Sequence, residues 1–495
     1  MKDISSPPYL DQMRYRLLRL MWLGIISVAW VIPVEAQTQP PNIMLIMGDD
    51  LGWYDMETTG NPDIKTPHLA SLVRESLRFQ NMFTSTAMCS PTRQQLLTGL
   101  YPVRSGAYPN HSWVYDSVKS LPHYFNEAGY RTALFGKTHF GPPSAFPFGH
   151  LQDEPLTKQT YQSIRNFIRQ EPSQPFFMAI TSHQPHVPWT KGDTTQYPSE
   201  KLSVPPYLID TQETRRALSL YYAEISYLDD QVGRCLRMLE EASLSDNTIV
   251  IFTSEQGPQL PFGKWTCYDM GLKTSFLVRW PNHVSPNTST EALAQYIDIL
   301  PTLLEIIGQD PTTVQTGISD AFGNQELDGK SFREVLLGHS SHHRDYVYGV
   351  HTTRGIIRGS DSYPIRSVRS DKYLYIQNLN AEQAFSNIVI ASDTLLYPSW
   401  LEKGETDQGA CQRADFYQHR PSEELYDVVS DPYQIMNLAS DHQYEAVKKS
   451  LKKELTAFMQ QQGDSGEETE LNALNRQAGY LKVHPQENNK PTTKE

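Results

Sequence analysis

The sequence predicts an α/β fold: a large, mostly parallel sheet sandwiched by helices, followed by a smaller C-terminal α+β subdomain that carries an antiparallel sheet. Three observations support this prediction. Nearly continuous apolar runs, which are typical of strands covered on both faces, alternate with patterns of helical period. Shorter runs with strand character follow in the C-terminal part. At 495 residues, the chain can bury a large core and hold two packed units.

Four apolar runs are predicted to be strands of the large sheet, and each leads directly into polar residues. The runs span residues 42–47, 132–135, 176–180 and 248–252. Helical patterns cover residues 67–79, 121–128, 160–169 and 213–242. Strands that alternate with helices form mostly parallel sheets, and ligands bind beyond the carboxyl ends of such strands. We therefore expect the polar residues after the four runs to converge on one site.

The C-terminal part has a different pattern and is predicted to form a second unit. Residues 37–345 are interpreted as the catalytic domain and residues 346–460 as the C-terminal subdomain. The strands and the helix expected in this subdomain are residues 366–369, 373–376, 424–427 and 444–460. Residues 461–495 are polar and charged with few apolar side chains, a composition that favours a disordered tail.

The first 36 residues are predicted to be a secretory signal peptide. Arg14, Arg16 and Arg19 precede an apolar run over residues 20–32, and Ala36 offers a small residue for cleavage before Gln37. An uncleaved signal anchor is the alternative, but the run is shorter than the roughly 20 residues that a membrane span needs. The mature protein is therefore expected to be periplasmic or secreted, without stable membrane insertion.

Charge and cysteine content restrict the partners and the covalent framework. The net charge of -13 makes nucleic acid an unsuitable partner, so an anionic substrate would need locally concentrated positive charge. Four cysteines are too few for a disulfide scaffold. Cys267 and Cys411 are the pair favoured for a bridge, although spacing alone does not establish it.

Paired acids at two strand ends indicate a metal site. Asp49 and Asp50 follow the first apolar run, and Glu255 and Gln256 follow the fourth. Like charges raise each other's pKa, so a cation between them would stabilise the ionised forms. A helix cap or Asx turn is the alternative for an isolated Asp-Asp pair. The second acid-bearing strand end favours the metal, and ligands that are all oxygen suit calcium ahead of magnesium.

The stretch Cys89-Ser90-Pro91-Thr92-Arg93, followed by Leu97-Thr98-Gly99, is the most informative motif. Together with the acids above and with the clusters 137–139, 183–186 and Lys264, it resembles the type I sulfatases of the alkaline-phosphatase-like superfamily. The resemblance runs from about Pro41 to Leu438. The Ser-Glu-Gln-Gly stretch at 254–257 departs from the commonest family pattern, which has Asp-Asn, and is similar to sulfamidase-like members.

The resemblance implies a role for each of these residues. Cys89 would be converted to formylglycine (3-oxoalanine) by a formylglycine-generating enzyme, and the hydrate of this group would be the nucleophile. One calcium ion would be bound by Asp49, Asp50, residue 89, Glu255 and Gln256. Arg93 would steady the nucleophile, while Lys137 and Lys264 would neutralise sulfate oxygens. His139 would be the base that helps expel sulfate, and His186 the proton donor to the leaving oxygen.

These residues predict a secreted sulfatase that hydrolyses sulfate esters of a sulfated carbohydrate, either a polysaccharide or its oligosaccharides. One alternative is a sulfamidase that acts on N-sulfated glucosamine. Another is a phosphonate or phosphate monoester hydrolase of the same superfamily. The complete set of catalytic residue types argues against a catalytically silent binding protein.

Overall fold

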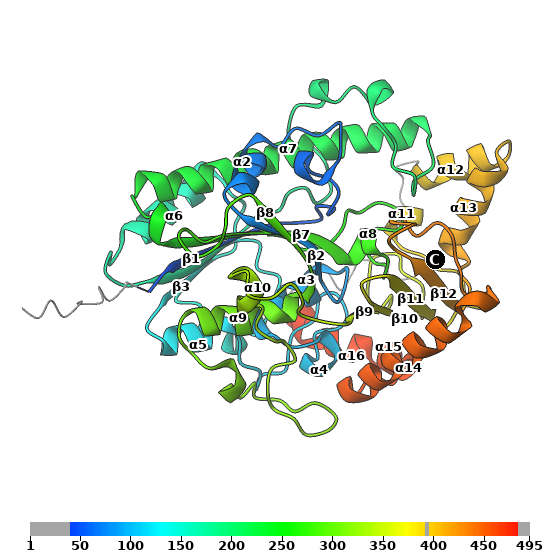
Figure 1. The fold of residues 1–495 in the computed structure, drawn as a ribbon. Coiled ribbons are helices and arrows are strands. Elements are labelled where there is room, and N and C mark those ends of the chain that lie inside the picture. Colours follow the sequence, from blue (N-terminus) through cyan, green and yellow to red (C-terminus); the bar gives the residue numbers. More distant parts are fainter. Residues whose placement is uncertain (1–39, 392–395, 484–495) are drawn as a thin grey trace, which may run out of the picture. The chain divides into compact units, whose positions relative to one another are not determined.

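The computed structural model describes residues 40–391 and 396–483, and its main element is an eight-stranded sheet with the order β4-β3-β5-β1-β6-β7-β2-β8 (Figure 1). The strands are β1 Asn42–Gly48, β2 Leu77–Phe83, β3 Arg131–Gly136, β4 His150–Gln152, β5 Phe176–Thr181, β6 Thr248–Ser254, β7 Lys273–Arg279 and β8 Thr288–Gln295. Among these strands, β7 alone runs antiparallel to its neighbours. The predicted mostly parallel sheet is confirmed.

Helices cover both faces of this sheet, as predicted. In β1, Met44 and Ile46 pack toward α2, α6 and α7, while Ile43, Leu45 and Met47 pack toward α3, α5 and α9 (Figure 1). This alternation explains why β1 reads as a continuous apolar run. The helices are α2 Pro67–Arg74, α3 Cys89–Thr98, α4 Pro102–Ser105, α5 Leu121–Glu127, α6 Lys158–Arg169, α7 Gln212–Glu241, α8 Asp269–Leu272, α9 Ile299–Ile306 and α10 Arg333–Leu336.

The helix predicted over residues 67–79 is wrong in its second half. Helix α2 ends at Arg74, and residues 77–83 form β2, which pairs with β7 and β8. Leu77 and Phe79 are buried and alternate with the less buried Arg78 and Gln80, so the local period is two rather than 3.6. Burying this alternating face as a strand is more favourable than extending helix α2 through residues 77–79.

The C-terminal part contains the predicted antiparallel sheet, with four strands in the order β12-β11-β10-β9. Its strands are β9 Val347–His351, β10 Ile365–Arg369, β11 Tyr373–Asn378 and β12 Glu423–Asp427. The helices are α11 Ile388–Ala391, α12 Leu396–Gly404, α13 Gln408–Gln418, α14 Glu445–Gln462, α15 Glu467–Leu471 and α16 Ala473–Val483. Leu451, Leu455 and Phe458 of α14 pack on this sheet. The boundary between catalytic domain and subdomain near residue 345 stays a prediction.

Two predictions for the C-terminal part are corrected. Residues 467–483 form α15 and α16 rather than a disordered tail, because buried polar contacts anchor this segment. Asp464 forms an ion pair with Arg366, and Glu470 accepts hydrogen bonds from Thr353 and from the backbone of Arg354. Residues 484–495 lie outside the described residues. The favoured Cys267–Cys411 bridge is absent, since Cys267 is buried, Cys411 is exposed, and all four cysteines are free.

The predicted signal peptide at residues 1–36 lies outside the described residues. Within the part of the chain that the structure describes, none of the helices has the length and apolar character required to cross a bilayer.

Candidate active site

The polar residues that follow the parallel strands converge, as the sequence predicts. Strands β3, β5, β1 and β6 are neighbours in the sheet, so their carboxyl ends meet at one edge. Asp49 and Asp50 follow β1, and Glu255 and Gln256 follow β6. Lys137 and His139 follow β3, while His183 and His186 follow β5. Cys89 is the first residue of α3, which comes after β2.

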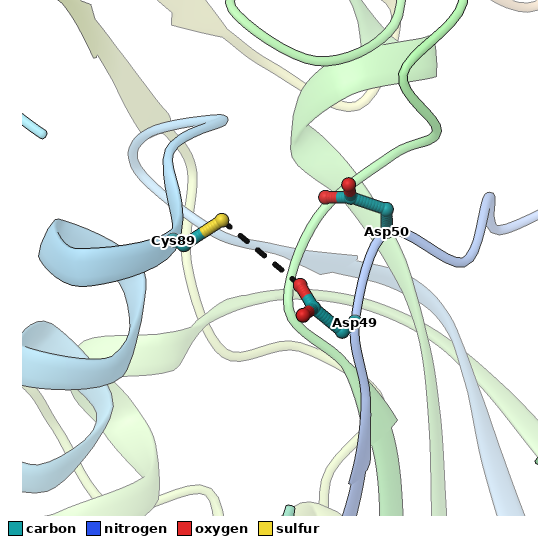
Figure 2. Close-up of side chains that lie close together, drawn as sticks. All are labelled: Asp49, Asp50 and Cys89. Atoms are coloured by element: carbon teal, nitrogen blue, oxygen red, sulfur yellow. Dashed lines mark hydrogen bonds between the residues drawn. The ribbon is translucent and has the colours of Figure 1, made fainter. Parts of the chain in front are cut away.

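Cys89 lies directly against the paired acids. Figure 2 shows its side chain pointing from the start of α3 toward Asp49, and Cys89 Sγ is 3.9 Å from Asp49 Oδ1. One potential ligand atom each from Asp49, Asp50 and Cys89 lie within 4.8 Å of one another, and all three residues are buried. Gln256 joins this group, because its Nε2 donates to Asp50 Oδ1 at 2.6 Å and lies 3.4 Å from Cys89 Sγ.

Each acid of the site is paired with a cation. Lys137 Nζ is 2.6 Å from Asp49 Oδ2, and Lys264 Nζ is 2.8 Å from Asp50 Oδ2. Arg93 Nη2 is 2.7 Å from Glu255 Oε2, with both side chains buried. Breaking such a buried pair leaves an uncompensated charge, so the three pairs fix one another in place. They also concentrate positive charge in a chain that is acidic overall.

The residues present fit a calcium ion. Glu255 Oε1 and Gln256 Oε1 are buried, and neither has a hydrogen-bond partner among the described residues. A buried acceptor without a partner costs about 1–3 kcal/mol, so each of these atoms is suited to a ligand. With Asp49 and Asp50 they form a set of oxygen donors, which a hard cation such as calcium prefers.

The thiol of Cys89 is activated by its surroundings. Burial raises the pKa of this thiol and Glu255 raises it further, but Lys137 and Lys264 lower it, and the result is a pKa of about 7. Its position at the first turn of α3 also favours negative charge, because backbone N–H groups are oriented toward it. A buried cysteine elsewhere behaves differently, since burial raises the pKa of Cys235 in α7 to about 12.

The two histidines differ in protonation. Burial, His111 and Lys137 hold the pKa of His139 well below its usual value, which favours the neutral imidazole. Burial and Lys264 lower the pKa of His186, but Asp50 and Asp49 raise it more, so the net shift is upward. His186 Nε2 is 3.7 Å from Asp50 Oδ2. Titratable groups whose pKa values are moved apart in this way are suited to be base and acid.

The backbone that carries these side chains is held by specific contacts. Asp50 has a positive φ of 69°, and Tyr221 of α7 donates a hydrogen bond to its carbonyl oxygen at 3.2 Å. Gly136 precedes Lys137 with a φ of 103°, and a Cβ there would lie 1.9 Å from the carbonyl oxygen of Thr181. Only glycine therefore lets β3 end so close to β5.

Several residues at the site were not found from the sequence. His139 contacts His111, whose Nδ1 is 3.1 Å from its Nε2, and the ring of Tyr480 packs against both histidines. His183 belongs to the same cluster as His186; its Nδ1 is buried without a partner among the described residues, and burial lowers its pKa. The spacing of the buried residues Ala473, Gln477 and Tyr480 is the helical signal that could have revealed α16.

A thiol with a lowered pKa, paired acids and three cations lie together near the strand ends of an α/β sandwich, an arrangement suited to binding a tetrahedral oxyanion. A family model described as Sulfatase matches residues 41–309, and one described as N-sulphoglucosamine sulphohydrolase, C-terminal, matches residues 257–393. An ulvan-active sulfatase from Formosa agariphila is 31% identical over 444 residues, which cover 87% of this chain and 82% of the relative. The chain belongs to the sulfatase family of the alkaline-phosphatase-like superfamily and is a sulfuric ester hydrolase.

Two further matches describe its relationships within that family. N-sulphoglucosamine sulphohydrolase from Homo sapiens is 29% identical over 479 residues, which cover 85% of this chain and 90% of the relative. A protein solved in complex with its substrate D-glucosamine-2-N,6-O-disulfate has a TM-score of 0.65 at 19% identity. That match covers 86% of this chain and 99% of the solved chain, and it shows the shared fold.

Proposed function

We propose that this protein is an exported sulfatase that removes sulfate from a sulfated carbohydrate, with formylglycine at position 89 and one calcium ion. The observation that carries the proposal is the position of Cys89, whose Sγ lies within reach of Asp49, Asp50 and Gln256 in a site with three cations, two of them buried and the third, Lys137, partly exposed. The cations match the negative charge of a sulfate group. Cys89 begins α3, so backbone N–H groups are available to the same anion.

The carbohydrate substrate is inferred from the relatives. One is an ulvan-active sulfatase, one is an N-sulphoglucosamine sulphohydrolase, and the structural neighbour contains a sulfated glucosamine. The signal peptide predicted at residues 1–36 supports export to the periplasm or the medium, where sulfated polymers are degraded.

The side chains divide the work in this proposal. Asp49, Asp50, residue 89, Glu255 and Gln256 would hold the calcium ion, which would supply positive charge next to the nucleophile. Formylglycine at position 89, made by a formylglycine-generating enzyme, would supply a hydroxyl nucleophile for sulfur and a second hydroxyl that permits release of sulfate. Lys137 and Lys264 bind the sulfate oxygens, and Arg93 holds Glu255 in place. His186 carries the proton for the leaving oxygen, and His139 accepts a proton.

Action on an N-sulfate is the second candidate. The second family model, whose description names an N-sulphoglucosamine sulphohydrolase, covers residues 257–393 of this chain. The Ser-Glu-Gln-Gly stretch at 254–257 resembles sulfamidase-like members as well. A phosphonate or phosphate monoester hydrolase is the third candidate, since the same cations suit any anion of this shape.

The experiment is a substrate panel for the protein produced together with a formylglycine-generating enzyme. The panel contains ulvan oligosaccharides, O-sulfated and N-sulfated glucosamine, and phosphate and phosphonate monoesters, and released sulfate or phosphate is measured. We expect sulfate release from O-sulfated sugars, abolished in Cys89→Ala and retained in the exposed-cysteine control Cys411→Ala. Faster release from N-sulfated glucosamine would favour the sulfamidase. Hydrolysis of the phosphorus esters alone would contradict the proposal.

A further inference from the structure

Only one ring nitrogen of His139 has a hydrogen-bond partner among the described residues. Its Nε2 lies 3.1 Å from Nδ1 of His111, whereas its own Nδ1 is buried and has no hydrogen-bond partner among the described residues. The backbone around His139 is fixed, because Arg93 and Thr181 donate hydrogen bonds to the carbonyl oxygen of Lys137 at 2.7 and 2.8 Å. With the backbone fixed, the orientation of the imidazole depends on its hydrogen bond with His111 and on the packing of Tyr480.

His111 is in turn held by the C-terminal helix α16. The ring centroid of Tyr480 is 5.1 Å from that of His111 and 5.8 Å from that of His139. Gln477 donates a hydrogen bond to the carbonyl oxygen of Asn110, the residue before His111. Arg476 donates to the carbonyl oxygens of Gly106 and Trp113 at 2.8 and 2.9 Å. These contacts fix both ends of the loop 106–113, which carries His111.

The geometry distinguishes between the two neutral forms of His139. If its proton were on Nδ1, a buried N–H would have no acceptor, which is unfavourable. With the proton on Nε2, that N–H donates to Nδ1 of His111 and the lone pair of Nδ1 stays available. The second form satisfies the buried donor, and it is the form that a base needs.

We propose that His111 is a positioning residue that accepts the Nε2–H of His139, and that α16 keeps His111 in place through Tyr480 and Gln477. This inference rests on the proposed function, in which His139 accepts a proton in the active site. The proton arrives at Nδ1, while the Nε2–H hydrogen bond to His111 remains in both charge states and stabilises the imidazolium. The proton returns to water after the reaction.

The first test measures the tautomer and needs no activity. The protein with Cys89→Ala is labelled with 15N-histidine, and His139 is assigned by the signals lost in a second protein that also contains His139→Gln. We expect the chemical shifts of a neutral ring protonated at Nε2. In His111→Phe the two tautomers should become mixed, and His111→Asn, which places an amide oxygen near the position of Nδ1, should restore the Nε2–H form. A ring protonated at Nδ1, or a spectrum unchanged by His111→Phe, would overturn the proposal.

The second test is kinetic. We expect His111→Phe to lower kcat by about 10–100-fold, the loss typical when a group that orients a functional histidine is removed, with little change in KM. His111→Asn should recover most of this loss. His283→Phe is the matched control, because His283 also stacks on an aromatic ring, that of Trp280, but follows β7, whose end lies at the other edge of the sheet.

The outcomes separate this inference from the proposed function. If the unmutated protein releases no sulfate from any substrate, the proposed function fails, while the tautomer measurement still decides the role of His111. If it releases sulfate and His111→Phe keeps full kcat, the positioning role is refuted. Should His111→Phe fail to fold, the tautomer of His139 in the protein with only Cys89→Ala decides the question.

Discussion

Two regions of the molecule meet at the active site and are built on different physical principles. The strand-end cluster around Cys89 consists of charged side chains placed at the ends of buried parallel strands, where the sheet itself fixes their distances. The C-terminal segment 464–483 contains no strand among its described residues and is attached through buried polar contacts, among them the ion pair of Asp464 with Arg366 of β10. The proposed function assigns the reacting groups to the first region, whereas Tyr480 of the second region contacts the rings of His111 and His139.

The groups proposed to react and the groups proposed to position them are therefore held by different kinds of contact. Asp49, Glu255 and their cations are interlocked, so a change in one disturbs the others. Single substitutions in the C-terminal segment are expected to lower its stability without altering the side chains of the strand-end cluster. Four changes test whether the two regions behave as differently as their construction implies.

Metal removal should have the largest effect and should act on the strand-end cluster. Treatment with a chelator is expected to lower sulfate release by about 10³-fold or more, since a cation that stabilises developing charge is lost. Calcium should restore activity better than zinc, because the proposed ligands are carboxylate and amide oxygens. Metal analysis and a sulfate-release assay measure this. Tightly bound zinc, with activity lost on its removal, would contradict the assignment.

Asp464→Ala should cause the next largest effect and should act through the C-terminal segment. It leaves Arg366 buried without its partner, which we expect to lower the free energy of unfolding by about 3–5 kcal/mol. Urea unfolding measures the loss, and proteolysis should cut near residue 464 first. Asp371→Ala, at an exposed position, is the control. Equal stability of Asp464→Ala and the parent protein would show that this ion pair does not anchor the segment.

The free energy of unfolding should depend on pH through Asp298. This residue and its partner Arg344 lie in the segment between β8 of the large sheet and β9 of the small sheet. Burial raises the pKa of Asp298, but Arg344, which donates to it at 2.7 Å, lowers it well below its usual value. Because the folded pKa is depressed, this stabilisation is present above the unfolded pKa near 4 and is lost as pH falls below it. Asp298→Asn should cost about 2–3 kcal/mol at pH 7, and this difference should shrink in urea titrations at pH 3. A difference independent of pH would refute the linkage.

Tyr480→Ala should have the smallest effect of the four. The variant removes the ring that packs on His111 and His139, and we expect kcat to fall by about 3–10-fold, in line with the 0.5–1.5 kcal/mol of an aromatic pair. Tyr480→Phe keeps the ring and should lose less. Leu474→Ala on the same helix is exposed and provides the control. A loss with Tyr480→Ala as large as that with chelator would place Tyr480 among the reacting groups.

The sequence was informative wherever a residue follows a buried strand. The strands ending at Gly48, Gly136, Thr181 and Ser254 each contain a nearly continuous apolar run, so the strands and the meeting point of their polar successors could be predicted. The same reasoning failed at β2, because its alternating pattern directly continues the helical pattern of α2 and only pairing with β7 and β8 determines where the helix ends.

The spacing of Ala473, Gln477 and Tyr480 signals helix α16, but the anchoring of the C-terminal segment could not be predicted, for a physical reason. Segment 464–483 has few apolar side chains, and composition treats such a stretch as disordered. Its stability comes from partners far away in the chain, such as Arg366 for Asp464 and Thr353 for Glu470. Such pairings leave no local periodicity. For the same reason the contact between His111 and His139, which joins two loops, was not visible in the sequence.

The chemical state of residue 89 decides whether formylglycine is the nucleophile of this protein. The protein is produced with and without a formylglycine-generating enzyme, the peptide that contains Cys89 is analysed by mass spectrometry, and sulfate release is measured on the same samples. The account predicts conversion of the thiol to the aldehyde, with activity proportional to the converted fraction. Full activity in a sample whose Cys89 remains an intact thiol would contradict it.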